Sequence, residues 1–308
     1  MGPSTESACL RCRAAAAVLI VLSSFGATSK PAAQNSYVDV ALDYLYDDNI
    51  GRAEADSDIL DDNIIALSGS FNLPQVLNAR AGLLHTLRLE YAGNTDWEDL
   101  SAFTASAAST FRFRPGAAFS APWYEAQLAA ALLQHRDSDI RDGAQVRVNL
   151  ALGSNLTDRL IGRIGYRYEL RRAWEEDVFD LDSHRFSGNV DYVINERVTL
   201  YGTLAWQTGE VVSTSTPRPQ MLNASEARHL DEALSERASS LIPVGNFFLG
   251  DRVAYRIDAD TLTGEIGLNL ALSQKLAMDF SALHFRAYGD GDNDYDGLQL
   301  RAGLLYRF

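Results

Sequence analysis

The last nine residues of the chain alternate between two kinds of side chain. Counting back from the C-terminus, Phe308, Tyr306, Leu304, Ala302 and Leu300 are apolar, and arginines occupy two of the positions between them. A period of two places successive side chains on opposite faces of a β-strand. The segment therefore predicts a strand with one apolar face and one face that carries charge.

Similar alternation recurs through the rest of the chain. It is clearest between residues 160 and 171, where Ile164 and Tyr166 stand on one side and Arg163 and Arg167 on the other. Counting such segments predicts about 12 strands, within a range of about 10 to 14. After residue 30 no apolar run approaches the roughly 18 residues that a membrane-spanning helix needs. The pattern therefore predicts an all-β fold.

The connections between the expected strands fall into two classes that alternate along the chain. Alternating short and long connections are typical of an up-and-down antiparallel barrel in a membrane, with the short turns on one side and the long loops on the other. This arrangement places both termini beside the short turns, on the periplasmic side. Short turns are expected at 73–78, 155–159, 195–197 and 273–275, and longer acidic loops at 47–62, 93–99, 135–143, 172–183, 208–252 and 288–296.

The C-terminal residues Leu304-Leu305-Tyr306-Arg307-Phe308 resemble the signature that Gram-negative outer-membrane barrels present to their insertion machinery. The resemblance is to the class and to no specific family. It implies a transmembrane β-barrel surrounded by outer-membrane lipid and lipopolysaccharide, with Tyr306 and Phe308 in the interfacial aromatic belt. Alternation alone also fits a soluble β-sandwich or lipocalin-like barrel. The ranks of Arg and Glu on one strand face favour the membrane barrel, because they are too charged for a dry core.

Residues 1–30 have the composition of a secretory signal peptide, in which two arginines precede the apolar run 14–22 and small residues follow it. Both cysteines of the chain, Cys9 and Cys12, precede that run. Lipid attachment is therefore not expected, and residues 31–308 contain no cysteine. We expect those residues to form a single outer-membrane barrel domain with one long outer loop.

The chain has a formal net charge of −14, and Lys275 is its only lysine after the leader. Nucleic acid is not an expected partner, because binding to phosphates requires clustered Lys and Arg side chains. Cations and cationic solutes are the neighbours that the net charge favours.

If the apolar strand faces meet lipid, the charged faces line the interior of the barrel. A basic stripe is expected on three neighbouring strands, roughly opposite two aspartates of the first strand, and such walls create a transverse field that orients polar solutes. The structural alternative is a set of arginine–carboxylate pairs that only fills the interior. The stripe comprises Arg147, Arg163, Arg167 and Arg185, the aspartates are Asp39 and Asp43, and the other predicted pore-lining residues are Arg88, Glu90, Glu169, Asp191 and Arg301.

The longest connection, residues 208–252, has the length of a functional or disordered loop. Asn223 and Glu226 have the spacing of a capping box, which predicts a short helix that continues to about Ser239. Two placements stay open at this point: a constriction inside the barrel, or a lid or partner surface outside it.

Asp292, Asp294 and Asp296 alternate near the last loop, as in the first half of a calcium-binding loop. The bidentate glutamate of that pattern is missing, because Gly303 stands in its place. The spacing therefore predicts at most a weakly bound divalent cation, and a plain solvated loop tip is the alternative. No other cofactor is expected.

Outer-membrane hydrolases use a serine with a histidine, or acidic residues with a histidine. His85, His184 and His284 are expected to face lipid or lie near a rim, and His135 stands beside aspartates of an outer loop. No serine and histidine emerge on one face, so no enzymatic site is predicted.

The function that these observations favour is porin-like, passive passage of small polar solutes through a charged lumen. One alternative is a structural, adhesive or assembly barrel that binds partners through its acidic outer loops. A second alternative is an outer-membrane hydrolase.

Overall fold

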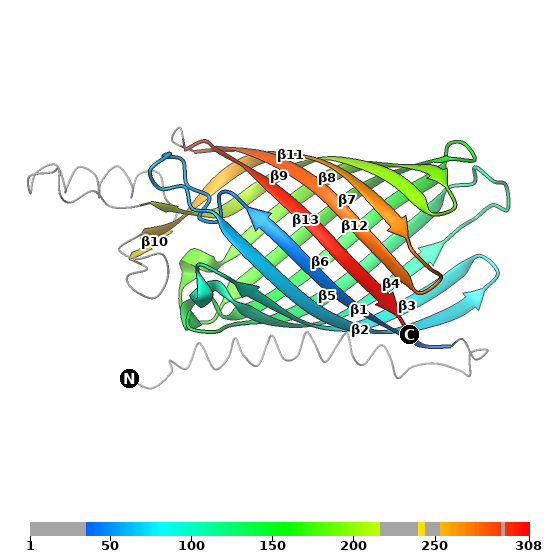
Figure 1. Cartoon of the computed structure of the whole chain (residues 1–308), viewed down its shortest axis with the longest axis horizontal. Helices are drawn as coiled ribbons and strands as arrows, with labels where there is room; N and C mark the ends of the chain where they lie inside the picture. The colour runs from blue at the N-terminus through cyan, green and yellow to red at the C-terminus, as the bar shows by residue number, and fades with distance from the viewer. Residues whose placement is uncertain (1–34, 216–239, 244–252, 291–292) are drawn as a thin grey trace, which may run out of the picture.

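A computed structural model of the chain describes residues 35–215, 240–243, 253–290 and 293–308. In this part of the chain, twelve long antiparallel strands close into a barrel (Figure 1). The expected signal peptide, the expected helix after Asn223 and the candidate ligand Asp292 lie outside the described residues. None of the helices in the described part is long and apolar enough to span a membrane.

The barrel strands follow one another around the ring in chain order, each antiparallel to its neighbours. β11 pairs with β9, and β13 pairs with β1 to close the ring, so the predicted all-β, up-and-down barrel is confirmed. The strands are β1 (Tyr37–Asp47), β2 (Asp62–Asn78), β3 (Ala81–Asn94), β4 (Ala102–Phe113), β5 (Trp123–His135), β6 (Gly143–Asn155), β7 (Leu160–Ala173), β8 (Leu181–Asn195), β9 (Val198–Ser215), β11 (Val253–Ala271), β12 (Leu276–Gly289) and β13 (Tyr295–Arg307).

Four shorter elements lie in the connections. The strand β10 (Ser240–Pro243) pairs with the first four residues of β11. Three single-turn 3₁₀ helices, η1 (Glu98–Leu100), η2 (Asp139–Arg141) and η3 (Asp177–Phe179), lie in three of the long loops.

The two ends of the barrel differ as the alternation of connections predicts. We call the end with the short connections and the C-terminus the turn end, and the opposite end the loop end (Figure 1).

Two connections at the turn end differ from expectation. The turn expected at 73–78 lies inside β2, which continues past a bulge between Val76 and Asn78 and turns at 79–80. The β4–β5 connection, residues 114–122, was not predicted.

Large apolar side chains are exposed on the outer wall of the barrel. Leu89, Ile164, Leu204 and Ile266 are each more than half exposed, at 57%, 61%, 61% and 59%. A soluble barrel would bury such residues, whereas a membrane barrel presents them to lipid tails. The exposed belt therefore argues against the soluble alternative.

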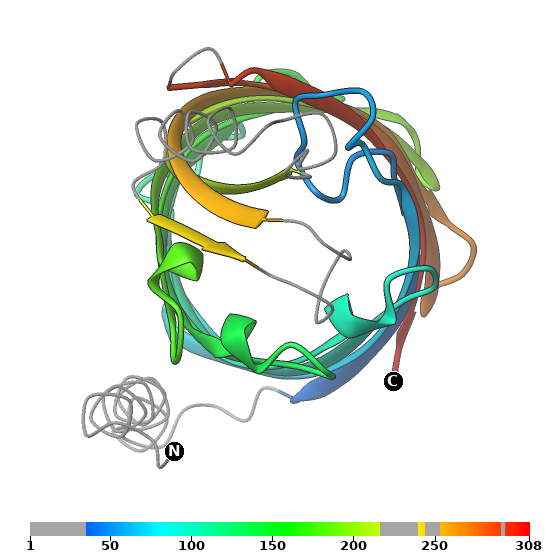
Figure 2. The same ribbon diagram turned by 90° about the vertical axis from the view of Figure 1, so that its left-hand side faces the viewer.

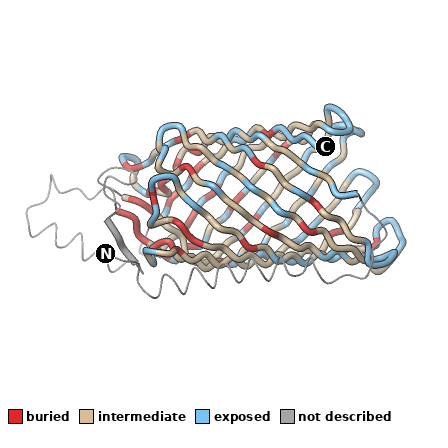
Figure 3. The backbone as a smooth tube through the Cα atoms, turned by 90° about the horizontal axis from the view of Figure 1, so that it is seen from below, coloured by how far each residue is buried: buried red, intermediate tan, exposed pale blue. Residues whose placement is uncertain are grey.

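Buried residues gather at the loop end instead (Figure 3). Val178, Phe179, Ala254 and Ile257 are at most 1% exposed there. The packed core of this protein thus lies across one end of the barrel, where the ends of β9 and β11 curve inward from the wall (Figure 2).

Candidate functional site

The seam between β1 and β13 carries two ion pairs. Nη2 of Arg301 lies 2.7 Å from Oδ1 of Asp43, and Nε of Arg307 lies 2.7 Å from Oδ1 of Asp39. Both aspartates were predicted to form an acidic wall. In the structure each aspartate instead forms an ion pair with an arginine, which neutralises its charge locally. The expected transverse field is therefore weaker on this side of the barrel.

The wall formed by β4 to β8 is more basic. Nε of Arg147 lies 2.8 Å from Glu169. Glu125 forms ion pairs with two arginines, with Nη2 of Arg163 at 2.9 Å and with Nε of Arg112 at 2.8 Å. Sequence analysis missed Arg112, which lies directly opposite Glu125 in the β4–β5 register. Alternation within one strand does not reveal such a pairing between strands.

A row of hydrogen-bonded polar side chains that ends in two arginines crosses the same strands at mid-barrel. Nε2 of Gln127 donates to Oγ1 of Thr110 at 2.8 Å, and Nδ2 of Asn149 donates to Oε1 of Gln127 at 2.8 Å. Nε of Arg167 then donates to Oδ1 of Asn149 at 2.9 Å, and Arg185 is the direct cross-strand neighbour of Arg167. We call these five residues the polar row. These hydrogen bonds fix the orientation of the Gln127 and Asn149 amides. The Asn149 amide in turn orients the Arg167 guanidinium.

Two cavities adjoin inside the ring. The mid-barrel cavity, of about 350 Å³, is lined by the polar row together with Glu125, Arg163, Ser187 and Asn189. The turn-end cavity, of about 510 Å³, shares Arg163 and Asn189 with it and is also lined by Asp191. Of the other predicted lining residues, Arg88 and Glu90 pair with each other on β3, away from these cavities.

The ends of β9 and β11 form an unexpected structure at the loop end. Residues 210–215 and 253–257, which sequence analysis assigned to a loop or left unassigned, remain paired strands. We call them the β9–β11 extension. Gly209 precedes it with a φ of +130°, and a side chain there would overlap the carbonyl of Asp182. Only glycine adopts this backbone without strain, so Gly209 permits the change of direction.

Hydrogen bonds attach the β9–β11 extension to loops on other parts of the wall. Both the amide and the hydroxyl of Thr214 donate to the carbonyl of Gly51, at 3.0 and 2.9 Å. Nη1 of Arg256 donates to the carbonyls of Asp177 and Asp180, at 2.7 and 3.0 Å. The extension therefore lies across part of the opening (Figure 2) as a fixed structure.

An apolar cluster packs beneath these contacts. Phe179 and Val178 from η3 meet Ala254 of the extension, and Trp97 and Ile140 from two other loops pack against them. We call this the loop-end cluster. Arg141 lies over the Phe179 ring at 4.5 Å. Burial, reinforced by the nearby charge of Arg171, lowers the pKa of Arg141 well below its usual value.

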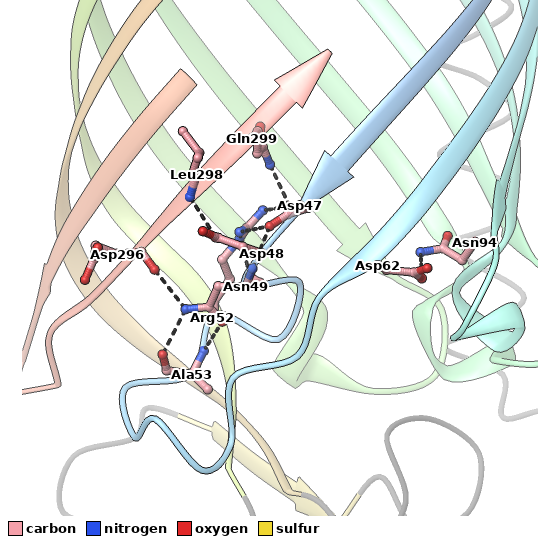
Figure 4. A network of polar contacts seen from close by, with 10 residues as sticks. All are labelled: Asp47, Asp48, Asn49, Arg52, Ala53, Asp62, Asn94, Asp296, Leu298 and Gln299. Atoms are coloured by element: carbon pink, nitrogen blue, oxygen red, sulfur yellow. Dashed lines mark hydrogen bonds and ion pairs between the residues drawn. The ribbon is translucent and has the colours of Figure 1, made fainter. Parts of the chain in front are cut away.

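The first long loop, residues 48–61, also folds toward the interior (Figure 2). Arg52 has a φ of 54°, an unusual value for a residue with a side chain. Its guanidinium is held by Asp47, with Nη2 to Oδ2 at 2.7 Å, and lies over the Phe285 ring at 4.4 Å. Nδ2 of Asn49 donates to the carbonyl of Asp296 at 2.9 Å, which ties this loop to β13 (Figure 4).

One histidine contact corrects the sequence analysis. Nδ1 of His85 lies 2.9 Å from Oγ of Ser109 on the neighbouring strand, so a serine and a histidine do share a face. The pairing depends on strand register, which alternation within single strands does not reveal. His85 is 3% exposed, and a lipid or peptide substrate cannot reach its imidazole. The contact is a buried polar pair on the apolar wall.

The remaining described histidines have local partners. Nδ1 of His184 lies 2.8 Å from the Tyr166 hydroxyl, Nδ1 of His135 lies 3.4 Å from Asp142, and Nε2 of His284 lies 3.5 Å from Asp296.

Candidate metal ligands do not come together in the part of the chain that the structure describes. No three His, Cys, Asp or Glu side chains there form a group that could hold a metal ion. Asp294 and Asp296 are described, and the latter faces His284. The weak cation site predicted with Asp292 stays a prediction.

The outer wall carries an apolar groove of about 890 Å³ over β4 to β9. It is lined by Ile164, Phe186, Leu204 and Trp206, and nothing lies within 4 Å of a side chain added at Gly188 in its wall. Its lining is suited to lipid chains and not to polar solutes, so the polar site of this protein lies in the interior.

Comparison with solved structures finds barrels of the same kind. The chain is similar to the COG4313 outer membrane channel from Pseudomonas putida F1, with 12% identity and a TM-score of 0.55 over 92% of this chain and 99% of that one. It is also similar to the KdgM porin, with 11% identity and a TM-score of 0.45 over 88% and 99% of the two chains. An active-site mutant of outer membrane phospholipase A from Escherichia coli gives 12% identity and a TM-score of 0.43 over 93% and 96%.

No family model matches the chain, and the search of curated proteins found no match. At such low identity the likeness to solved structures concerns the fold alone. The chain has the closed antiparallel barrel fold of outer-membrane proteins.

Proposed function

We propose that this protein is a porin-like channel of an outer membrane that lets small polar solutes cross passively through its interior. The two adjoining polar cavities inside the ring are the observation that carries the proposal. A barrel of about twelve strands encloses more space than its side chains fill, so water and small solutes can occupy the interior. The interior side chains bind and orient solutes, and no bond is made or broken.

The exposed apolar belt supports a membrane location, with the turn end on the periplasmic side and the loop end outside. The β9–β11 extension and residues 48–61 reduce the opening at the loop end, which favours small solutes over polymers. Likeness of fold to the COG4313 outer membrane channel agrees with this proposal.

Conductance across a planar lipid bilayer tests the proposal. The matched variants are Ser187→Cys, which lines the mid-barrel cavity, and Val190→Cys, which is 46% exposed on the outer wall. After removal of the leader neither variant retains another cysteine. We expect steady openings from both, and a bulky water-soluble maleimide should reduce the current only through Ser187→Cys. Unaltered current through labelled Ser187→Cys, or no openings, would contradict a channel through this interior.

A structural or adhesive barrel predicts no steady openings, so the same recordings separate the two functions. The hydrolase alternative predicts cleavage of phospholipid or peptide. We expect none, because the buried imidazole of His85 is covered by its neighbours. Cleavage that is lost in Ser109→Ala would establish the hydrolase instead.

A further inference from the structure

Among the described residues, two arginines at the end of the polar row, Arg167 and Arg185, lack the ion pairs that neighbouring interior arginines form. In the part of the chain that the structure describes, Arg147 and Arg163 each form an ion pair with a glutamate. Arg301 forms one with Asp43. In that described part, no carboxylate oxygen lies within 4.0 Å of a side-chain nitrogen of Arg167 or Arg185. Their positive charge is therefore not neutralised by a direct partner.

The two arginines are also direct neighbours across two paired strands. Arg167 and Arg185 occupy directly opposite positions in the β7–β8 register and face the same interior. Like charges in such positions repel each other and destabilise the pair. The side chains that act on Arg185 electrostatically from a greater distance are Glu265 and Glu169, and Glu169 is already paired with Arg147. An anion placed between the two arginines would relieve the repulsion.

The polar row restricts how Arg167 can respond to this repulsion. Its Nε is engaged by Asn149, whose amide is engaged by Gln127. The hydrogen bond holds the plane of the guanidinium and leaves its two terminal nitrogens for other acceptors. Arg167 is thus already oriented before an anion arrives, which reduces the entropy lost on binding.

The chemistry of the cavity indicates which anion fits. Two arginines at paired positions that line one cavity suit the two oxygens of a carboxylate, since arginine donates paired, nearly parallel N–H groups. Ser187, Asn189 and Thr110 line the same cavity and supply neutral hydrogen-bonding groups. Glu125 also lines it, and its carboxylate is paired with Arg112 and Arg163. A volume of about 350 Å³ lies within the range of small-molecule sites. Together these features suit a small carboxylate that also carries hydroxyl groups.

We infer that Arg167 and Arg185 form a subsite that binds the carboxylate of a small, hydroxylated organic anion inside the barrel. The inference rests on the proposed function and names its substrate class. Basic side chains in a narrow lumen select anions. The channel is therefore anion-selective at the mid-barrel cavity, although the chain as a whole carries a net charge of −14.

The first test measures binding without conduction. Saturation-transfer NMR on the folded, detergent-solubilised barrel compares gluconate with glucose, two probes of similar size of which only the first carries a carboxylate. The variants are Arg167→Gln and Arg185→Gln, and the control is Arg159→Gln, which removes the same charge from an exposed turn. We expect gluconate to bind more tightly than glucose. Each lumen variant should weaken gluconate binding about tenfold or more, the loss typical of one charge-assisted hydrogen bond.

The second test measures selectivity in a bilayer. Under a potassium chloride gradient, the reversal potential of the wild type and of Arg159→Gln should indicate preference for chloride, and gluconate should reduce the current. Arg167→Gln and Arg185→Gln should shift the reversal potential toward zero and lower the sensitivity to gluconate about tenfold. A heat-dependent mobility shift on gels verifies that each variant is folded.

The outcomes separate the two proposals. Steady openings with the same selectivity and the same gluconate binding in all four proteins would refute the subsite and leave the channel intact. Gluconate binding that requires both arginines, without openings in any protein, would support the subsite and refute the channel function.

Discussion

Phe179 offers the sharpest test of the loop-end cluster. Its side chain is 1% exposed and packs with Val178 and Ala254, under the β9–β11 extension. Replacing a buried Phe by Ala costs about 3 to 5 kcal/mol, because apolar contacts are lost and a cavity remains. Phe179 lies in a loop and not in the strand ladder. We therefore expect Phe179→Ala to destabilise the closed position of the extension and to leave the barrel itself folded.

Hydrogen exchange measures this local effect. Amides of residues 253–257 exchange through local opening, and each 1.4 kcal/mol changes the opening equilibrium tenfold. A loss of about 3 to 5 kcal/mol predicts exchange that is faster by a factor of about one hundred to several thousand. Amides in the middle of β5 and β6 should keep their protection. In bilayers the variant should show larger or noisier openings.

The control is Leu150→Ala, which removes a large apolar side chain that is 48% exposed on the outer wall. It should leave exchange at 253–257 unaltered. Unaltered exchange in Phe179→Ala would refute the reasoning. So would equal loss of protection throughout the barrel, since the cluster would then belong to one cooperative unit with the strands.

Further predictions concern the seam, the bend and the buried pair. A double-mutant cycle with Asp43→Asn and Arg301→Gln should give a coupling of about 0.5 to 1 kcal/mol in urea unfolding, since Arg301 is 48% exposed and water screens the pair; a coupling near zero would contradict an energetic role for the seam pair. Gly209→Ala should destabilise the protein by about 1 to 3 kcal/mol, because alanine is strained at a φ of +130°; an unaltered unfolding midpoint would mean that the bend relaxes. Ser109→Ala should cost about 1 kcal/mol through loss of the His85 hydrogen bond, and equal stability would show that the bond contributes nothing.

The strand pattern was predictable because alternation reports directly on two different environments. Ile164 and Arg163 could be assigned to opposite faces without any tertiary information, since a strand has a side-chain period of two. The same rule gave the barrel class, and it predicts an interior position for the charged residues. It failed at β2, where Pro74 and the bulge after Val76 interrupt the ideal pattern within one strand.

The loop end was not predictable from local pattern. Val178 and Phe179 stand in an acidic connection, and nothing in their neighbourhood indicates that Ala254 covers them. Their burial results from contacts between loops far apart in the chain, which depend on barrel closure. Polar side chains such as Gln127 and Asn149 were missed for a related reason. Uncharged amides have no distinctive signal in a strand, and their row appears only when five strands align in register.

The central claim is that apolar side chains face lipid while charged ones face an aqueous interior. Single cysteines at neighbouring positions of β7 test it most directly, in protein that has lost its leader and been reconstituted in liposomes. A membrane-impermeant, water-soluble maleimide should react readily with Arg163→Cys, which lines both cavities, and very slowly with Ile164→Cys, which is exposed on the outer wall. Equal reaction at both positions, or faster reaction at Ile164→Cys, would contradict the account.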